Sequence, residues 1–158
     1  VLPLLEEAGC NVHVRCKSIR VKNPVGLRRI DKIITQPYPG FPTDSQALFT
    51  TLTSVARGTS VIVENIFESR FKHVPELVRM GAKIRAEGRV AVVDGVPKLY
   101  GAEVFSPDLR GGAALVVAGL CAEGITTVNN IGYIDRGYEE LSDNLCMLNA
   151  DIHRKVKN

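Results

Sequence analysis

The chain has 158 residues, 45% of them hydrophobic and 23% charged, so it is long enough for one globular domain with its own core. Its net charge of +3 permits a small anionic ligand, but no Lys/Arg run with interleaved aromatics occurs, so we expect no nucleic-acid partner. No apolar stretch approaches the ~18–20 residues that cross a membrane, so we expect no membrane partner either.

The first residues, "VLPLLEEAGC", contain neither an initiator Met nor the basic start of a signal peptide. They have the pattern of a helix already under way, so we expect the chain to be a fragment of something longer. The cysteines form no CxxC pair, and no His lies at metal-ligand spacing from two of them. We therefore expect no metal, a reducing cytoplasmic location, and core positions for Cys10, Cys121 and Cys146, which have apolar neighbours.

Three segments share one pattern, in which the end of an amphipathic helix leads through a small turn residue into an alternating strand. They are "LLEEAGCNVHV", "ELVRMGAKIRA" and "NLCMLNADIHR". The turn residues are Gly9, Gly81 and Asn149, and Gly or Asn at this position is typical of a left-handed helix cap. The pattern therefore predicts an internal repeat of about 70 residues.

A second correspondence relates residues 42–71 to residues 107–137, with a one-residue slip at the proline. It makes Asp44 equivalent to Arg110, and each of the two stands in a loop at the start of a helix. The correspondence therefore predicts that the two residues occupy equivalent places in successive repeat units.

The elements inside these stretches follow from periodicity and composition. Residues 45–56 have apolar side chains at helical spacing, and 113–121 is apolar nearly all round, which predicts a buried helix. Residues 59–66 and 125–131 are rich in β-branched residues and follow glycine turns, so we expect strands there.

The stretch 89–104 contains Asp94-Gly95 between two apolar runs, which predicts a hairpin turn at that dipeptide. The repeat unit is then βαβαββ, an α/β (α+β) arrangement, and the chain holds about two units and the end of a third. We assign 1–36 to the tail of a preceding unit and 37–102 and 103–158 to two further units.

Asp44 follows the rigid lead-in "YPGFPT" and precedes a helix. An Asp at a helix start often caps free backbone N–H groups. A cap, however, needs no such lead-in, so the sequence leaves two roles open for Asp44, a helix cap or a reactive acid.

Arg110 is followed by Gly111 and Gly112 at a second helix start. Glycines there could leave backbone N–H groups open to an anion, or they could simply allow close helix packing. The spacing matches no known phosphate-binding loop, so both alternatives stay open.

Two further stretches, "FESRF" and "YIDRGYE", each place an acid beside an arginine just after a strand. Glu68 precedes Arg70, and Asp135 precedes Arg136. These acids and arginines could form exposed salt bridges of little energetic value. Alternatively, arginines from equivalent units could converge on one carboxylate or phosphate, which a guanidinium binds in bidentate fashion.

The stretches "PYPGFPTDSQA", "GTSVIVENIFESRFKHVPELVRMGAKI", "KLYGAEVFSPDLRGGAALVVAGLCAEGITTV" and "YIDRGYEELSDNL" resemble the C-terminal part of the UDP-N-acetylglucosamine 1-carboxyvinyltransferases. The resemblance implies the enolpyruvyl transferase fold, an inside-out α/β barrel of βαβαββ units. It implies transfer of the enolpyruvyl group of phosphoenolpyruvate to the 3-hydroxyl of UDP-N-acetylglucosamine, a step of peptidoglycan synthesis and so of cell-wall formation. No cofactor is implied.

The resemblance also implies roles for particular residues. Asp44 corresponds to the aspartate that contacts the sugar hydroxyl and is the candidate general base. Ile66 corresponds to a residue that contacts the sugar nucleotide through its backbone. Arg110 and Arg136 correspond to arginines that hold phosphoenolpyruvate or its phosphate, and Glu68 to an acid that lines the same cleft.

The resemblance places the proton donor and the remaining basic residues of the family in a first domain, and no cysteine of this chain matches the donor position. We therefore expect the missing N-terminal domain to be a partner of this chain, and the chain alone to lack turnover. A 3-phosphoshikimate 1-carboxyvinyltransferase-like enzyme and a non-catalytic binding module are the alternatives.

Overall fold

The structure is a computed structural model that describes residues 1–23 and 25–155. Residue 24 of the 1–36 stretch and residues 156–158 of the 103–158 stretch therefore lie outside it. Its elements are α1 (Leu2–Glu7), β1 (Asn11–Arg15), β2 (Ser18–Lys22), β3 (Lys32–Ile34), the 3-10 turn η1 (Thr43–Ser45), α2 (Gln46–Ser54), β4 (Thr59–Val63), α3 (Val74–Arg79), β5 (Lys83–Glu87), β6 (Val90–Asp94), β7 (Glu103–Phe105), α4 (Leu109–Cys121), β8 (Thr127–Asn129), α5 (Gly132–Asp135) and α6 (Leu141–Met147). The described helices are too short and polar to cross a membrane.

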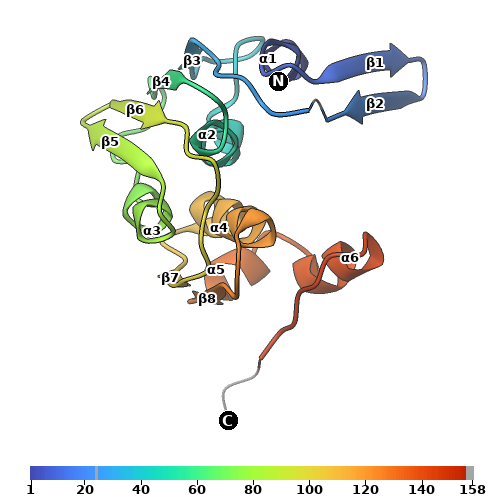
Figure 1. The fold of residues 1–158 in the computed structure, drawn as a ribbon, viewed down its shortest axis with the longest axis vertical. Coiled ribbons are helices and arrows are strands. Elements are labelled where there is room, and N and C mark those ends of the chain that lie inside the picture. Colours follow the sequence, from blue (N-terminus) through green and yellow to red (C-terminus); the bar gives the residue numbers. More distant parts are fainter. Residues whose placement is uncertain (24, 156–158) are drawn as a thin grey trace.

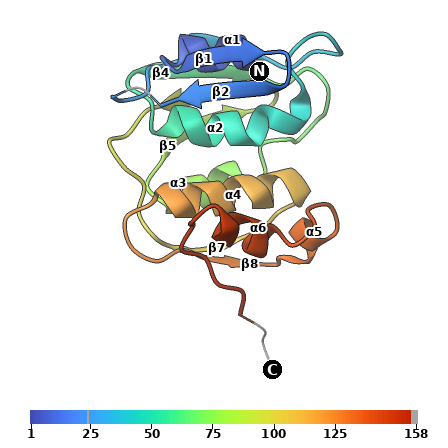
Figure 2. The ribbon, with the colours of Figure 1, turned by 90° about the vertical axis from the view of Figure 1, so that its right-hand side faces the viewer.

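Helices α2, α3 and α4 lie inside and the strands outside (Figure 2). Figure 2 shows α2, α3 and α4 in the middle of the molecule, with the β1–β2 hairpin and β4 on one side and β7–β8 on the other. In Figure 1 the hairpin extends away from the helices. This arrangement agrees with the expected mixed α/β class and its inside-out layering.

The central sheet has the strand order β3-β4-β6-β5. Its first pair, β3 and β4, is parallel with Ile33 opposite Ile62, and α2 makes the crossover between these strands. The other two pairs are antiparallel. Together β3-α2-β4-α3-β5-β6 form one complete βαβαββ unit.

The next unit begins in the same way. Strands β7 and β8 are parallel, with Val104 opposite Val128, and α4 makes their crossover. Before the complete unit, α1 and the β1–β2 hairpin repeat the order of α3, β5 and β6. The structure thus contains the end of one unit, a whole unit and much of a third, with the first strand of the whole unit, β3, inside the 1–36 stretch.

The predicted left-handed caps are confirmed. Gly9 and Gly81 have φ values of 96° and 93°, and Asn149 has a φ of 65°. Each follows a helix at the same point of its unit. A side chain with a Cβ is strained in this conformation, although Asn tolerates it better than most residues, which explains why only Gly and Asn occur at these positions.

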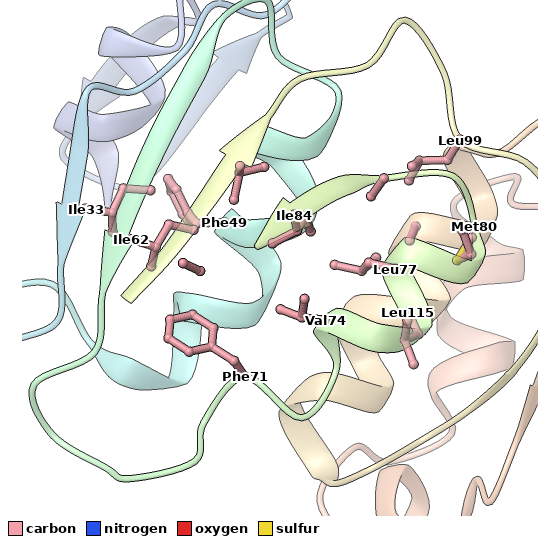
Figure 3. Close-up of a cluster of buried hydrophobic side chains, with 14 of the residues drawn as sticks. Ile33, Phe49, Ile62, Phe71, Val74, Leu77, Met80, Ile84, Leu99 and Leu115 are labelled. Carbon is pink, nitrogen blue, oxygen red and sulfur yellow. The ribbon is translucent and has the colours of Figure 1, made fainter. Parts of the chain in front are cut away.

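One hydrophobic core joins the units. Figure 3 shows Ile33, Ile62 and Phe49 between the sheet and α2, and Leu77 of α3 close to Leu115 of α4. These five side chains are at most 5% exposed, and burying each contributes about 1.5–3 kcal/mol. The unit that begins with β7 therefore packs against the complete unit, and the two units share one hydrophobic core.

Helix α4 differs from the prediction of an all-buried helix. It begins four residues earlier, at Leu109, and its outer face is open, with Val117 37% and Leu120 39% exposed. The prediction of core cysteines was also wrong, since Cys121 and Cys146 are exposed and Cys10 is only partly buried. Apolar neighbours in sequence did not indicate which face of each helix meets the core.

The prediction of a hairpin turn at Asp94-Gly95 was also wrong. The hairpin lies between β5 and β6, and its turn is formed by Gly88 and Arg89. Gly95 instead lets the chain pass the end of α2, because a Cβ there would lie 1.5 Å from the carbonyl oxygen of Ala56. The glycine signalled close backbone approach rather than a tight turn.

The strand expected at the start of "ADIHR" is not formed either. Residues 151–155 have no assigned helix or strand, although β1 and β5 occupy the equivalent places in the other units. Those two strands pair with β2 and β6, and no described strand lies beside 151–155. A strand requires such a partner to satisfy its backbone groups.

His73, at the start of α3, gives a testable consequence of burial. Its side chain is 1% exposed and its Nε2 has no hydrogen-bond partner among the described residues. Burial lowers the pKa of His73 to about 4, against smaller opposing effects of the Asp108 charge and the Arg70 carbonyl. The unfolded chain, with a pKa near 6.5, therefore takes up the proton first as the pH falls.

Stability should fall as the pH drops from about 6.5 toward about 4, by about 2–3 kcal/mol at pH 4.5, because only the unfolded state gains the proton. Urea unfolding at a series of pH values measures this slope. His73→Gln should flatten it over that window, and His13→Gln, at an exposed site, should not. Parallel pH profiles for wild type and His73→Gln would contradict the assignment.

Candidate active site

Asp44 stands on a closed, well-anchored loop. The amide of Gln36 donates to the carbonyl of Phe41 (2.9 Å), and that of Gly40 donates to Pro37 (2.8 Å). A Cβ on Gly40 would lie 2.4 Å from the Cβ of Gln36, so the turn requires glycine. Phe41 is buried and packs edge-on against Phe49 of α2, with ring centroids 5.0 Å apart, which fixes the loop on the helix.

Among the described residues, the Asp44 carboxylate contacts two arginines and no backbone amide. Its Oδ1 accepts from Nη2 of Arg70 at 3.1 Å, and its Oδ2 accepts from Nη2 of Arg110 at 2.7 Å. No side chain caps η1 or α2. The side chain of Asp44 is still 56% exposed. The structure thus gives no support to the helix-cap alternative and leaves an accessible carboxylate between two cations.

Arg110 is held by a second partner. Its Nη1 donates to the hydroxyl of Tyr138 at 2.9 Å, and its guanidinium lies over that ring at 5.5 Å from the centroid. The hydrogen bonds to Asp44 first, and to Tyr138 second, raise the pKa of Arg110. Arg110 is therefore a permanently charged side chain, aimed at Asp44 and only 30% exposed.

The two glycines after Arg110 serve packing. The amide of Gly111 donates to Oδ1 of Asp108 at 2.7 Å, so Asp108 caps α4 and takes a donor that an anion would need. A Cβ on Gly112 would lie 2.1 Å from Oγ of Ser106 and 2.8 Å from Ile134. Of the two alternatives left open by the sequence, the structure supports close packing.

The acid–arginine neighbours do not pair with each other. Glu68 contacts Arg89 at 3.4 Å, Asp135 contacts Arg154 at 2.7 Å, and Arg70 turns to Asp44. Successive loop residues point in different directions, so adjacency in sequence did not predict the partners. Arg70, for which the sequence left open an exposed salt bridge or a place among converging arginines, is thereby a neighbour of Asp44.

Two further predicted site residues, Arg136 and Ile66, lie in the segments that follow α5 and β4. Arg136 directly follows α5, is exposed, and has its guanidinium 5.8 Å from the centre of the Tyr133 ring. No contact among the described residues brings Arg136 to Asp44. Ile66 is half-buried, and its amide donates to Oε1 of Glu64 at 2.8 Å, while no hydrogen bond of the described residues uses its carbonyl.

Glu64, which the sequence reasoning missed, is a buried residue whose side chain is only 1% exposed. Its Oε1 accepts from the Thr35 hydroxyl (2.9 Å) and from the amides of Ile66 (2.8 Å) and Phe67 (3.0 Å), and its Oε2 accepts from the Thr43 hydroxyl (2.8 Å). Burial raises the pKa of Glu64, but the hydrogen bonds outweigh it and hold the pKa below its usual value. A charged residue ending a β-branched strand was the only available sequence signal.

The Asp44 carboxylate is accessible to solvent. Two hollows of the described residues, of about 280 and 330 Å³, are lined by the β1–β2 hairpin and by residues around Phe71 and Gly88, and neither includes Asp44, Arg70 or Arg110. No group of three or more His, Cys, Asp or Glu side chains in the described part could hold a metal ion. The arrangement offers a carboxylate that can accept a proton and arginines that can bind an anion.

Comparison with known proteins assigns this geometry to a family. A model of the EPSP synthase (3-phosphoshikimate 1-carboxyvinyltransferase) family matches residues 1–145. Curated relatives named UDP-N-acetylglucosamine 1-carboxyvinyltransferase include one from Zymomonas mobilis, 51% identical over 98% of this chain, and one from Desulfofundulus thermocisternus, 57% identical over 95% of it. The chain spans 36% of the length of the first relative and 61% of the second.

Solved structures give the same assignment at the level of the fold. The crystal structure of the enolpyruvyl transferase NikO from Streptomyces tendae superposes with a TM-score of 0.87 at 31% identity, over 96% of this chain and 35% of that one. An EPSP synthase from Acinetobacter baumannii, at 19% identity and a TM-score of 0.58, shares the fold. These matches confirm the enolpyruvyl transferase fold, and the chain belongs to the EPSP synthase (3-phosphoshikimate 1-carboxyvinyltransferase) family.

Proposed function

We propose that this chain forms one wall of an active site that transfers the enolpyruvyl group of phosphoenolpyruvate to the 3-hydroxyl of UDP-N-acetylglucosamine. The observation that carries the proposal is the Asp44 carboxylate, which is half exposed, makes no capping bond and is bracketed by arginines from two repeat units. The names of the relatives with 51–57% identity support this acceptor and donor. We further propose that the reaction serves peptidoglycan synthesis and takes place in the cytoplasm.

In this proposal Asp44 takes the proton from the sugar hydroxyl, which must come within ~2.6–3.2 Å of the carboxylate. Arg110 and Arg136 hold the carboxylate and phosphate of phosphoenolpyruvate and stabilise the charge that develops as phosphate leaves. The free carbonyl of Ile66 accepts a hydrogen bond from the sugar nucleotide, and Glu68 lines the same side of the site.

The acceptor is the sugar nucleotide rather than a shikimate phosphate. The relatives that are about half identical to this chain over the matched residues carry the name of the sugar-nucleotide enzyme, whereas two structures of EPSP synthase from Acinetobacter baumannii are 19% and 20% identical. A titration of the folded enzyme with each acceptor discriminates between the two.

The other wall comes from a further domain. The Asp44 side chain is more than half exposed to solvent, and this chain spans about a third of the length of the first relatives. In the whole enzyme, 37–102 together with β3, and 103–158, serve as two successive units of one domain, with the rest of 1–36 as the tail of the unit before.

We expect the 158-residue chain alone to release no phosphate from phosphoenolpyruvate and UDP-N-acetylglucosamine, because half of the site is absent. A chimera in which this chain replaces the matching segment of the Zymomonas mobilis relative should turn over. Phosphate release measures both. An enzyme-like rate for the chain alone would contradict the two-wall site, and a folded chimera without activity would contradict the proposed function.

Asp44→Asn in that chimera should lower kcat by about 10²–10⁴-fold, because the amide cannot accept the hydroxyl proton. Its melting temperature should change little, since the side chain makes only exposed ion pairs. Asp31→Asn is the matched control, because Asp31 also pairs with an arginine (Arg29, 2.9 Å) but lies before β3. A large loss of stability with the rate per folded molecule unchanged would show that Asp44 is structural.

A further inference from the structure

We propose that Glu64 is a positioning residue, which holds the turn that carries Asp44 and the loop that carries Ile66 in one fixed geometry. The inference rests on the proposed function for the importance of those two loops. The contacts themselves stand independently of it.

The four hydrogen bonds of Glu64 reach three separate segments. Oε2 accepts from Thr43, the residue before Asp44, and Oε1 accepts from the amides of Ile66 and Phe67. Oε1 also accepts from Thr35, which continues from β3 and whose hydroxyl in turn accepts from the amide of Asn65 at 2.8 Å. One carboxylate therefore ties both loops to the end of the β3–β4 pair.

The segments that Glu64 contacts also carry the ion pair between Arg70 and Asp44. The guanidinium of Arg70 lies 5.2 Å from the centroid of the Phe67 ring and donates to Asp44 at 3.1 Å. Glu64 thus holds the loop on which Arg70 rests and the turn on which Asp44 rests. Loss of its acceptors would free both sides of the pair together.

The repeat shows that the fold does not itself require a buried carboxylate here. The equivalent of Glu64, 66 residues later, is Asn130, which is exposed. The two units share a backbone hydrogen bond at this point, since the amide of Thr35 donates to Val63 and the amide of Ser106 donates to Asn129, each at 2.9 Å, although Asn130 itself has a left-handed φ of 57°. The second unit keeps its strand pair without such a group, so the carboxylate serves the loops of the first unit.

Glu64→Ala in the chimera should lower kcat and raise the KM for UDP-N-acetylglucosamine, with a combined loss of about 100-fold, since misplacement by about 1 Å has that effect. Glu64→Gln should recover most of this loss, because its amide oxygen can take the place of Oε1 and its NH₂ can donate to the Thr43 hydroxyl. Thr43→Val, which removes only the link to the Asp44 turn, should lower kcat and leave KM within about 2-fold, and it tests the inference even if Glu64→Ala does not fold.

Ser60→Ala is the matched control on the same strand. Ser60 is fully buried, and its hydroxyl accepts from the amide of Ile30 at 3.1 Å. This variant should lower the melting temperature while kcat and KM stay at wild-type values. If Glu64→Ala and Thr43→Val behave like Ser60→Ala, Glu64 is merely structural and the inference is wrong.

Amide hydrogen exchange on the 158-residue chain tests the positioning role of Glu64 without any assay of activity. Glu64→Ala should speed exchange at Ile66 and Phe67 by more than about 10-fold, the direct result of losing their acceptor, and Glu64→Gln should not. Unchanged protection in Glu64→Ala would overturn the inference. An inactive wild-type chimera with this exchange pattern would instead overturn the proposed function alone.

Discussion

The contact of one carboxylate with two guanidinium groups is the interaction on which the site depends. Arg70 comes from the complete repeat unit and Arg110 from the next, and each donates to a different oxygen of Asp44. Asp44 and Arg110 occupy equivalent places in their units, so the internal symmetry brings an acid opposite a base. Exposed ion pairs stabilise a fold only slightly, and the value of this one lies in holding charged groups of both signs where a ligand can reach them.

The inside-out layering makes this contact possible. Because α2 and α4 pack against each other in the middle of the molecule (Figure 2), Asp44, in the η1 turn before α2, lies beside Arg110 in the first turn of α4. Gly112 permits α4 to approach Ser106 and Ile134 closely. The buried carboxylate of Glu64 also accepts a hydrogen bond from the hydroxyl of Thr43, the residue before Asp44.

Much of the fold could be predicted because its repeat leaves local signals. Gly and Asn are the residues favoured at a left-handed helix cap, so they mark the same point in each unit. The errors had a tertiary origin. Gly95 resembled a hairpin residue because the sequence cannot show that Ala56 passes within contact distance, and the apolar run of α4 could not indicate which face meets α2. Asp44 and Arg110 could be singled out from loop composition and resemblance, whereas their contact, Arg70 and Glu64 depend on side-chain directions that no local pattern encodes.

A structure of the chimera with UDP-N-acetylglucosamine bound tests the central claim most directly. The account predicts an oxygen of Asp44 within ~2.6–3.2 Å of the sugar 3-hydroxyl, with Arg70 and Arg110 still beside the carboxylate. A sugar nucleotide bound elsewhere, with Asp44 paired only to its two arginines, would contradict it.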